Sequence, residues 1–336
     1  MKELNLAVVG ATGAVGQEIL KVIEERKVPY KSIKMLASSR SAGKKLQFMG
    51  KEYTVEETTL EVFKGVDVTL FAGGPASRAF GRDVQAMGTV VIDNSSTFRL
   101  EDDVPLIIPE VNGDAAKDHQ GLIASPNCST TLLVGAINPL HRKAGIKRII
   151  LSTYQAVSGA GAAGLSELEE QTRQILNGEP IHPDVFQHQI AFNLIPHIDV
   201  WQEADYSKEE TKVIHETHKI LSDKDMAITV TAVRVPVMRS HAESIYLEFE
   251  EKLSPDEARD ILQAAPRVVL QDAPQDNIYP MPITATGSDD IFVGRIRRDL
   301  YNDHALNMWA CFDQIRKGAA TNTVQILELL LEKNWI

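Results

Sequence analysis

Two cysteines occur in the 336-residue chain, and only one has neighbours that could make its thiol reactive. Cys128 stands in A-S-P-N-C-S-T-T, where Pro126 and Asn127 indicate the start of an apolar helix with Asn127 as its cap. A helix N-terminus favours the thiolate, so Cys128 is either a nucleophile or a core residue. Cys311, in the apolar run N-M-W-A-C-F, is expected to lie in the core, as free cysteines often do.

A glycine-rich turn near the N-terminus supplies a second chemical signal. It follows a predicted strand and opens a predicted helix, which is the context of a dinucleotide site. Glycine permits close approach of the backbone, and the helix N-terminus offers free N–H groups to a pyrophosphate. The alternative is a βα turn that binds nothing. The expected cofactor-binding residues here are Gly10, Thr12, Gly13, Ala14, Val15 and Gly16.

The end of the second predicted strand indicates which dinucleotide binds. NAD-specific sites usually place an acidic residue there for the ribose 2′-hydroxyl. This chain has Ser38, Arg40 and Ser41 instead. Hydroxyl groups and a guanidinium suit a 2′-phosphate, so NADP is favoured over NAD, unless Arg40 is only a solvated loop residue.

A thiolate beside a nicotinamide predicts attack on a carbonyl carbon, and that chemistry needs a general acid/base and a site for an acceptor.

Two regions with different secondary-structure patterns are expected to position these groups. The first 125 residues alternate short β-rich runs with helical periodicity, which predicts βαβ units in a parallel sheet, a Rossmann-type dinucleotide-binding domain. From about residue 127 long strands are interleaved with helices, which predicts an α+β substrate and dimerisation domain with a mixed sheet. The expected domains are 1–127, completed by a C-terminal helix in 318–336, and 128–317.

Composition excludes several classes of protein. A net charge of −11 with scattered Lys and Arg gives no footprint for nucleic acid or an anionic membrane, so a small-molecule substrate is favoured. No apolar run of membrane-spanning length occurs, and a strand from about residue 4 leaves no room for a signal peptide, which predicts a cytoplasmic protein. The two cysteines form neither a disulfide framework nor a zinc motif, so no metal is expected.

Seven motifs together resemble one enzyme family along essentially the whole chain, the aspartate-β-semialdehyde dehydrogenases. They are G-A-T-G-A-V-G, S-S-R-S-A-G, D-N-S-S-x-F-R, P-N-C-S-T, Y-Q-A-V-S-G-A-G, S-K-E-E-x-K and R-V-P-V-x-R-S-H. The resemblance implies NADP-dependent interconversion of aspartate semialdehyde plus inorganic phosphate with β-aspartyl phosphate. It also implies a place in lysine or diaminopimelate, threonine, methionine and isoleucine biosynthesis, in a homodimer or homotetramer.

The resemblance also implies residue roles. Cys128 corresponds to the nucleophile, His241 to the acid/base and Gln155 to the residue that positions the thioester carbonyl. The implied substrate ligands are Arg234 for the α-carboxylate, Glu209 for the ammonium, Arg99 and Lys212 for phosphate, and Asn127. The α-carboxylate and α-ammonium of aspartate semialdehyde would be matched by a bidentate arginine and a carboxylate. The spacing of Glu209 and Lys212 places both side chains on one helix face. Without the resemblance, these could be surface charges and a structural histidine.

The remaining cofactor residues are less specific. Ser158 and Gly159 belong to a glycine loop that could approach the nicotinamide ribose, and Gln314 corresponds to a family residue near the nicotinamide amide. Gly73 and Asn94 follow predicted strands, at the edge where a parallel sheet binds its cofactor. No role is assigned to His182, His188 or His197.

Three other readings remain open. N-acetyl-glutamyl-phosphate reductases use the same Cys and His logic, but their substrate has no ammonium for Glu209. A glyceraldehyde-phosphate type dehydrogenase would need two phosphate sites and usually prefers NAD. A non-catalytic dinucleotide sensor would leave Cys128, Gln155 and His241 without roles.

Overall fold

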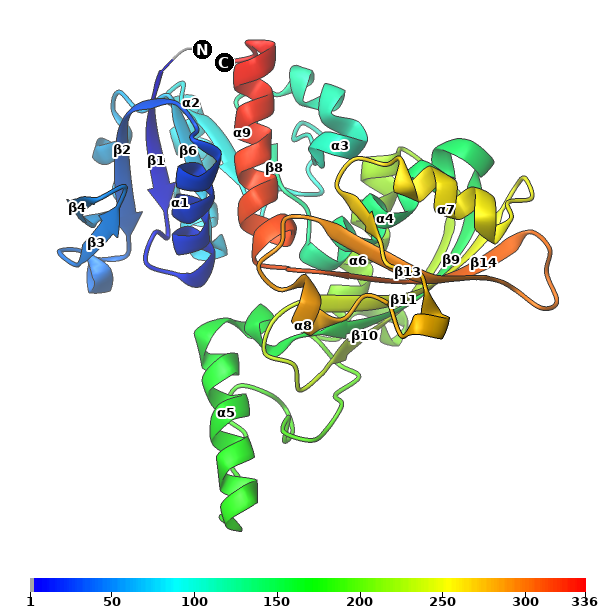
Figure 1. Cartoon of the computed structure of the whole chain (residues 1–336). Helices are drawn as coiled ribbons and strands as arrows, with labels where there is room; N and C mark the ends of the chain where they lie inside the picture. Colours follow the sequence, from blue (N-terminus) through cyan, green and yellow to red (C-terminus); the bar gives the residue numbers. More distant parts are fainter. Residues whose placement is uncertain (1–2) are drawn as a thin grey trace. The chain divides into compact units, whose positions relative to one another are not determined.

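The computed structural model describes residues 3–336 and divides them into two compact units (Figure 1). The first comprises the chain up to Asn127 together with Gly318–Ile336, and the second comprises Cys128–Lys317. Each unit is built on a six-stranded sheet, and a short antiparallel β3–β4 hairpin accompanies the first.

The sheet of the first unit is entirely parallel, in the order β5-β2-β1-β6-β7-β8. Its strands are largely buried apolar runs, as parallel strands covered on both faces require. The strands of this unit are β1 (Leu4–Val9), β2 (Tyr30–Ala37), β3 (Lys45–Phe48), β4 (Lys51–Thr54), β5 (Glu56–Glu57), β6 (Val68–Phe71), β7 (Val90–Asp93) and β8 (Leu122–Ala124).

The helices of the first unit include the last one in the chain. They are α1 (Ala14–Arg26), α2 (Gly74–Ala86), α3 (Pro109–Asn112) and α9 (Thr321–Lys333). Helix α9 lies beside α1 and α3, buries Val324, Leu327 and Leu330 in the same core as β1, and is joined to α1 by an ion pair between Arg26 and Glu328 at 2.6 Å (Figure 1). Nonpolar burial of this kind is the main stabilising contribution to such packing.

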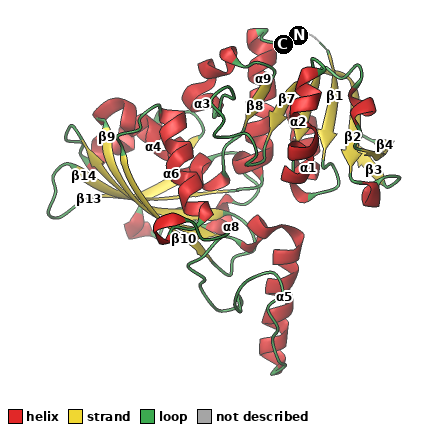
Figure 2. Cartoon of the chain, turned by 180° about the vertical axis from the view of Figure 1, so that it is seen from behind, coloured by secondary structure: helices red, strands yellow, loops and turns green. Residues whose placement is uncertain are grey.

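The sheet of the second unit is mixed, in the order β10-β9-β11-β14-β13-β12. Strands β9 and β10 are parallel, whereas β11 is antiparallel to both β9 and β14. Figure 2 shows this sheet with α4 and α6 on one side. The strands are β9 (Ile146–Gln155), β10 (Ala227–Arg234), β11 (His241–Phe249), β12 (Val268–Leu270), β13 (Ile291–Arg298) and β14 (Ala305–Phe312). The predicted fold class, a parallel sheet followed by a mixed one, is confirmed.

The helices of the second unit pack on both faces of the mixed sheet, except α5, which packs against the short turn Val157–Ala160. They are α4 (Cys128–Ala144), α5 (Gly161–Asn177), α6 (Lys208–Leu221), α7 (Pro255–Gln263) and α8 (Pro282–Ala285). The first helix shares one apolar core with α6, α7 and the sheet, while Ala285 of α8 packs with Ala242 and Cys311 on the other face. A capping box between Ser207 and Glu210 fixes the start of α6.

Candidate active site

Three candidate residues meet where the neighbouring strands β10, β9 and β11 end or begin, on one side of the mixed sheet. Gln155 is the last residue of β9, Arg234 the last of β10, and the two are partners in register. His241 is the first residue of β11, which runs antiparallel to β9 and therefore begins where β9 ends. The exposed fractions are only 2% for Gln155, 7% for Arg234 and 0% for His241. Strand pairing thus brings together side chains that are far apart in the sequence.

The peptide groups of Ala156 hold two of these side chains. Its N–H donates to His241 Nδ1 at 3.1 Å, and its carbonyl accepts from Arg234 Nη1 at 2.7 Å. Because Nδ1 accepts a hydrogen bond, the proton of the neutral ring belongs on Nε2. Within residues 3–336 the buried Nε2 has no hydrogen-bond partner. The ring therefore offers an N–H group to the site.

The protonation of His241 follows from its surroundings. Burial, and to a smaller extent the positive charge of Arg234, lower the pKa of His241 to about 3, against weaker opposing effects of Glu209 and the Ser240 backbone. At pH 7 the ring is consequently neutral. A neutral imidazole with its proton on Nε2 can donate a hydrogen bond to an oxygen of a substrate.

Arg234 is held between an aromatic ring and opposite charges. Its guanidinium lies 5.8 Å from the centre of the Phe186 ring. Burial lowers the pKa of Arg234, while the charges of Glu209 and Cys128 act in the opposite direction. The thiol of Cys128 is therefore within electrostatic range of the guanidinium. Cys128 itself is the first residue of α4 and is partly exposed, whereas Cys311 is fully buried and has its pKa raised to about 12, chiefly by burial.

Gly159 lies against the side chains of Arg234 and His241. A Cβ at this position would be 2.8 Å from Arg234 Nη1 and 3.5 Å from His241 Cε1. Any larger residue would have to displace the guanidinium, so a glycine is required by space. The glycine loop that begins at Ser158 therefore packs directly against Arg234 and His241.

A chain of polar contacts joins Gln155 to the start of α6. Gln155 Nε2 donates to Glu209 Oε1 at 3.0 Å, and Lys212 Nζ lies 3.2 Å from Glu209 Oε2. Lys212 also donates to Asp199 Oδ2 at 2.7 Å. Burial lowers the pKa of Lys212, but the charges of Glu209 and Asp199 outweigh it, and the pKa is raised. Lys212 therefore stays charged between two carboxylates.

The predicted dinucleotide-binding residues of the Gly10–Gly16 turn and the Ser38–Ser41 segment lie in the first unit. At the turn, Gly10 has φ +81°, and a Cβ on Gly16 would lie 2.1 Å from the Gly10 carbonyl oxygen, so both positions require glycine. The residues of this turn are exposed or half-exposed at the start of α1, apart from Ala11 and Gly16. Ser38, Arg40 and Ser41 follow β2 in an exposed or half-exposed segment. These are the positions that the sequence predicts to contact a dinucleotide.

Gly73 and Asn94 follow β6 and β7, at the carboxyl edge of the same parallel sheet. Arg99 is buried nearby in the chain, and its Nε and Nη2 donate to the carbonyls of Ser125 and Asn94, each at 2.9 Å. Asn127 ends the first unit, one residue before Cys128. Arg99 is thus fixed by backbone carbonyls at the carboxyl edge of the sheet, where parallel sheets usually bind ligands.

Sequence reasoning missed Asp199 and the Ala156 peptide. Asp199 lies in the run N-L-I-P-H-I-D, and only its ion pair with Lys212 shows that it belongs to the site.

Of the unassigned histidines, His182 and His188 are exposed, and His197 stacks on Trp201 with ring centres 4.2 Å apart. Across the described chain, no three His, Cys, Asp or Glu side chains form a group suited to a metal ion. Nor does any described helix combine the length and apolar character needed to cross a membrane.

A further buried carboxyl group, that of Glu243, lies two residues after His241 on β11. Glu243 is on the same face of β11 as His241 and pairs in register with Thr153 and Ala310. It is fully buried, and neither carboxyl oxygen has a hydrogen-bond partner within the described residues. Burial raises the pKa of Glu243 well above its usual value. The side chain is consequently held as a neutral acid.

Glu243→Gln is expected to raise thermal stability more at about pH 8 than at about pH 5. Because the folded pKa is raised, the unfolded chain releases this proton first as pH rises, and wild-type stability falls by about 1.4 kcal/mol for each pH unit over which only the unfolded chain is ionised. Glutamine removes this loss. Melting temperatures at both pH values measure it, with Glu248→Gln, a partly exposed position on the same strand, as control. An equal change at both pH values would contradict the assignment.

Two domain models of semialdehyde dehydrogenases match most of the chain. The NAD binding domain matches residues 5–119, and the dimerisation domain matches residues 137–317. These matches define the class of protein as NAD(P)-dependent semialdehyde dehydrogenases, which are oxidoreductases.

Individual relatives narrow the class to one family. The aspartate-semialdehyde dehydrogenase of Aquifex aeolicus is 51% identical over 99% of both chains. The crystal structure of aspartate semialdehyde dehydrogenase II from Vibrio cholerae complexed with ASA is 40% identical, with a TM-score of 0.94 over 99% of both chains. The Candida albicans aspartate semialdehyde dehydrogenase with NADP is 26% identical, with a TM-score of 0.78 over the full length of both. The chain belongs to the aspartate-semialdehyde dehydrogenase family, as the seven motifs predicted.

Proposed function

We propose that this protein catalyses the NADP-dependent, phosphate-dependent interconversion of L-aspartate 4-semialdehyde and L-4-aspartyl phosphate through a thioester on Cys128. The observation that carries the proposal is the buried group formed by Arg234, Glu209, His241 and Gln155 at one edge of the mixed sheet. Related enzymes carry the same name, and one was solved with ASA bound.

The charges of the site fit an unblocked amino acid. The planar guanidinium of Arg234 suits the α-carboxylate, because it can donate two parallel hydrogen bonds. Glu209, near the start of α6, offers an oxygen to the α-ammonium. An N-acetylated substrate would leave the buried Glu209 without that partner, which favours aspartate semialdehyde over N-acetyl-glutamyl substrates.

NADP fits the residues of the first unit. The Gly10–Gly16 turn has the backbone geometry for a pyrophosphate, and Ser38, Arg40 and Ser41 provide hydroxyls and a positive charge for a 2′-phosphate. Gly73 and Asn94 complete the set in this unit. In the second unit Ser158, Gly159 and Gln314 are the proposed nicotinamide-side residues. When bound, NADP would accept the hydride from the carbon that becomes the thioester.

Side chains of the second unit are the proposed nucleophile, hydrogen-bond donor and carbonyl-positioning group. Cys128 in the first turn of α4 attacks the aldehyde carbon as the thiolate, which a helix N-terminus stabilises. The Nε2–H of His241 donates to the oxygen that gains negative charge, and Gln155 positions the carbonyl group. Phosphate then opens the thioester and releases the thiolate of Cys128. The proposed phosphate ligands are Lys212 in this unit and, in the first unit, Arg99, with Asn127 as a further substrate ligand.

The biological setting belongs to the same proposal. Reductive formation of aspartate semialdehyde would supply lysine or diaminopimelate, threonine, methionine and isoleucine synthesis in the cytoplasm. The enzyme would act as a homodimer or homotetramer, since the second unit matches a dimerisation domain. Its partners would be small molecules, not nucleic acid or membranes, given the net charge of −11.

The test is the absorbance of NADPH formed by purified protein from fresh aspartate semialdehyde, inorganic phosphate and NADP. Parallel reactions omit phosphate, replace NADP by NAD, or use N-acetyl-glutamate semialdehyde. Phosphate-dependent NADPH formation from aspartate semialdehyde is expected. Equal rates without phosphate, or a preference for the N-acetylated aldehyde, would contradict the proposal.

Arg234→Lys is expected to raise KM for the semialdehyde by about 10- to 100-fold with a smaller effect on kcat. A point charge does not reproduce a two-pronged hydrogen bond, and bonds to charged groups contribute about 1.5–3 kcal/mol. Steady-state kinetics with varied semialdehyde measure the change. Arg267→Lys, at a partly exposed ion pair with Asp290, is the matched control. An unchanged KM would move the carboxylate site elsewhere.

A further inference from the structure

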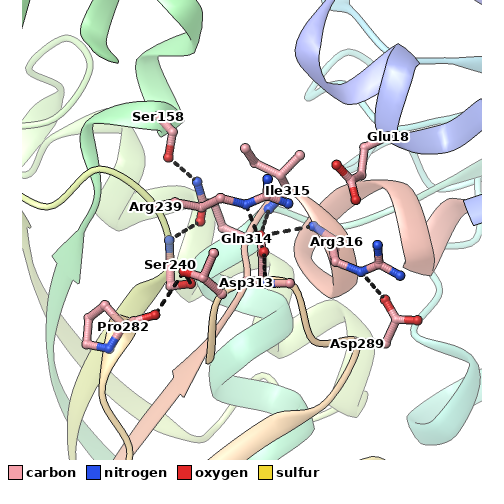
Figure 3. Close-up of polar contacts among 12 residues, drawn as sticks. Glu18, Ser158, Arg239, Ser240, Pro282, Asp289, Asp313, Gln314, Ile315 and Arg316 are labelled. Atoms are coloured by element: carbon pink, nitrogen blue, oxygen red, sulfur yellow. Dashed lines mark hydrogen bonds and ion pairs between the residues drawn. The ribbon is translucent and has the colours of Figure 1, made fainter. Parts of the chain in front are cut away.

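One carboxylate binds several segments of the second unit together behind the proposed nicotinamide side of the site. Asp313 follows β14 and is fully buried. Its Oδ2 accepts from Arg239 Nε at 2.8 Å and from the Gly287 N–H at 2.7 Å. Its Oδ1 accepts from the N–H groups of Ile315 and Arg316 at 3.0 and 3.3 Å (Figure 3). Four donors from three segments thus converge on one side chain.

Two of the three segments joined by this carboxylate carry proposed active-site residues. Arg239 is two residues before His241, and Gln314 directly follows Asp313. The Gln314 side chain is a second link between them, since its Oε1 accepts from the Ser240 N–H at 2.8 Å and its Nε2 donates to Ser158 Oγ (Figure 3). An amide has a second N–H and a second lone pair, so Gln314 can make these bonds and still contact a ligand.

The turn before His241 has a backbone conformation that needs support. Ser240 has φ +76°, in the left-handed region that non-glycine residues seldom occupy. Its N–H is bound by Gln314, its Oγ lies 2.7 Å from Thr286 Oγ1, and the preceding residue is bound by Asp313. The conformation that delivers His241 to the start of β11 is therefore maintained by the residues around Asp313.

We propose that Asp313 is a positioning residue that fixes the acid/base His241 and the nicotinamide-side Gln314 relative to each other. It acts through Arg239 on one segment and through the 314–316 turn on the other. A carboxylate suits this task because both oxygens accept and the negative charge strengthens each bond. Asparagine has the same shape, but it loses the charge and replaces one acceptor by a donor that would face N–H groups. The inference rests on the proposed function for its kinetic consequence.

Asp313→Asn is expected to lower kcat by about 10- to 100-fold, the usual cost of displacing reacting groups by about 1 Å, with KM for the semialdehyde changed less than about twofold. Aldehyde-deuterated aspartate semialdehyde should show a larger isotope effect on kcat in the variant, because hydride transfer becomes slower. The matched control is Asp272→Asn. The side chain of Asp272 is 1% exposed, against 0% for Asp313, and its Oδ2 accepts from Arg259 Nε at 2.8 Å and from the Ile296 N–H.

A readout independent of turnover separates this inference from the proposed function. In protein with ¹⁵N-labelled histidine, His241 should be present as the Nε2–H form in the wild type and in Asp272→Asn, and as a mixture of both neutral forms in Asp313→Asn. If the wild type forms no NADPH, the proposed reaction fails while this signal still decides the positioning role.

Equal kcat values and unchanged His241 signals in Asp313→Asn and Asp272→Asn would overturn the inference. A loss confined to KM would also overturn it. If Asp313→Asn does not fold, Arg239→Lys tests the same link from its partly exposed partner. That variant should show a smaller fall in kcat with the same change in isotope effect, and an unchanged kcat would count against the inference.

Discussion

Cys128→Ala is expected to lower phosphate-dependent NADPH formation by at least about 10⁴-fold, as loss of a covalent nucleophile does in other enzymes. Alanine leaves no atom that can attack the aldehyde carbon and no leaving group for phosphate to displace. The fold should persist, because Cys128 is partly exposed at the first residue of α4 and contributes only at the margin of the apolar core. Turnover of the purified variant under saturating substrate measures the effect.

The second cysteine provides the control for this experiment. Cys311→Ala removes a thiol that is fully buried and whose pKa burial raises to about 12, so it should retain wild-type turnover at a temperature where it is folded. Iodoacetamide should inactivate the wild type and Cys311→Ala at similar rates. Comparable turnover in Cys128→Ala and the wild type would place Cys128 among the core residues.

His241→Ala is expected to lower kcat by about 10²–10⁴-fold, the range for a lost general acid or base. The ring is the buried hydrogen-bond donor at the edge of the sheet, and alanine leaves the developing oxygen charge without it. Semialdehyde KM should change little, because the proposed ligands of the substrate's carboxylate and ammonium are Arg234 and Glu209. Steady-state kinetics at saturating phosphate measure both constants.

The pH profile tests the same residue in the wild type. Since the pKa of His241 is lowered to about 3, the ring stays neutral above that pH, and no acidic limb of kcat near pH 6.5 should come from it. His241→Asn serves as the comparison, because it keeps a donor of similar reach without titrating. A limb near pH 6.5 that is present in the wild type and absent from His241→Asn would contradict the neutral assignment.

The fold class was predictable because its signals are local. Alternation of apolar runs with helical periodicity indicated the parallel sheet, and Gly10 and Gly16 marked the turn between β1 and α1. The start of α6 was visible as well, since Ser207 and Glu210 have the spacing of a capping box. These features depend on neighbours within a few residues, so the sequence displays them directly.

Much of the site was not predictable from residue patterns alone. The contact of Gln155 with Glu209 depends on strand register and helix packing over 54 positions of sequence separation. The Ala156 peptide has no side-chain signature, and Asp199 and Asp313 resemble surface residues until their partners are known. Glu243 even contradicts the expectation that a glutamate on a strand faces solvent. Long-range packing decides all of these.

The place of α9 in the first unit has a consequence for synthesis of the protein. The core formed by β1 and α1 includes Val324, Leu327 and Leu330, so it is complete only when α9 has left the ribosome. At about 5–20 residues per second, translation of residues 128–317 would delay that helix by roughly 10–40 s. The second unit is contiguous and could fold first. A nascent chain lacking the final helix would expose apolar surface on its N-terminal unit, which is a natural binding surface for a chaperone.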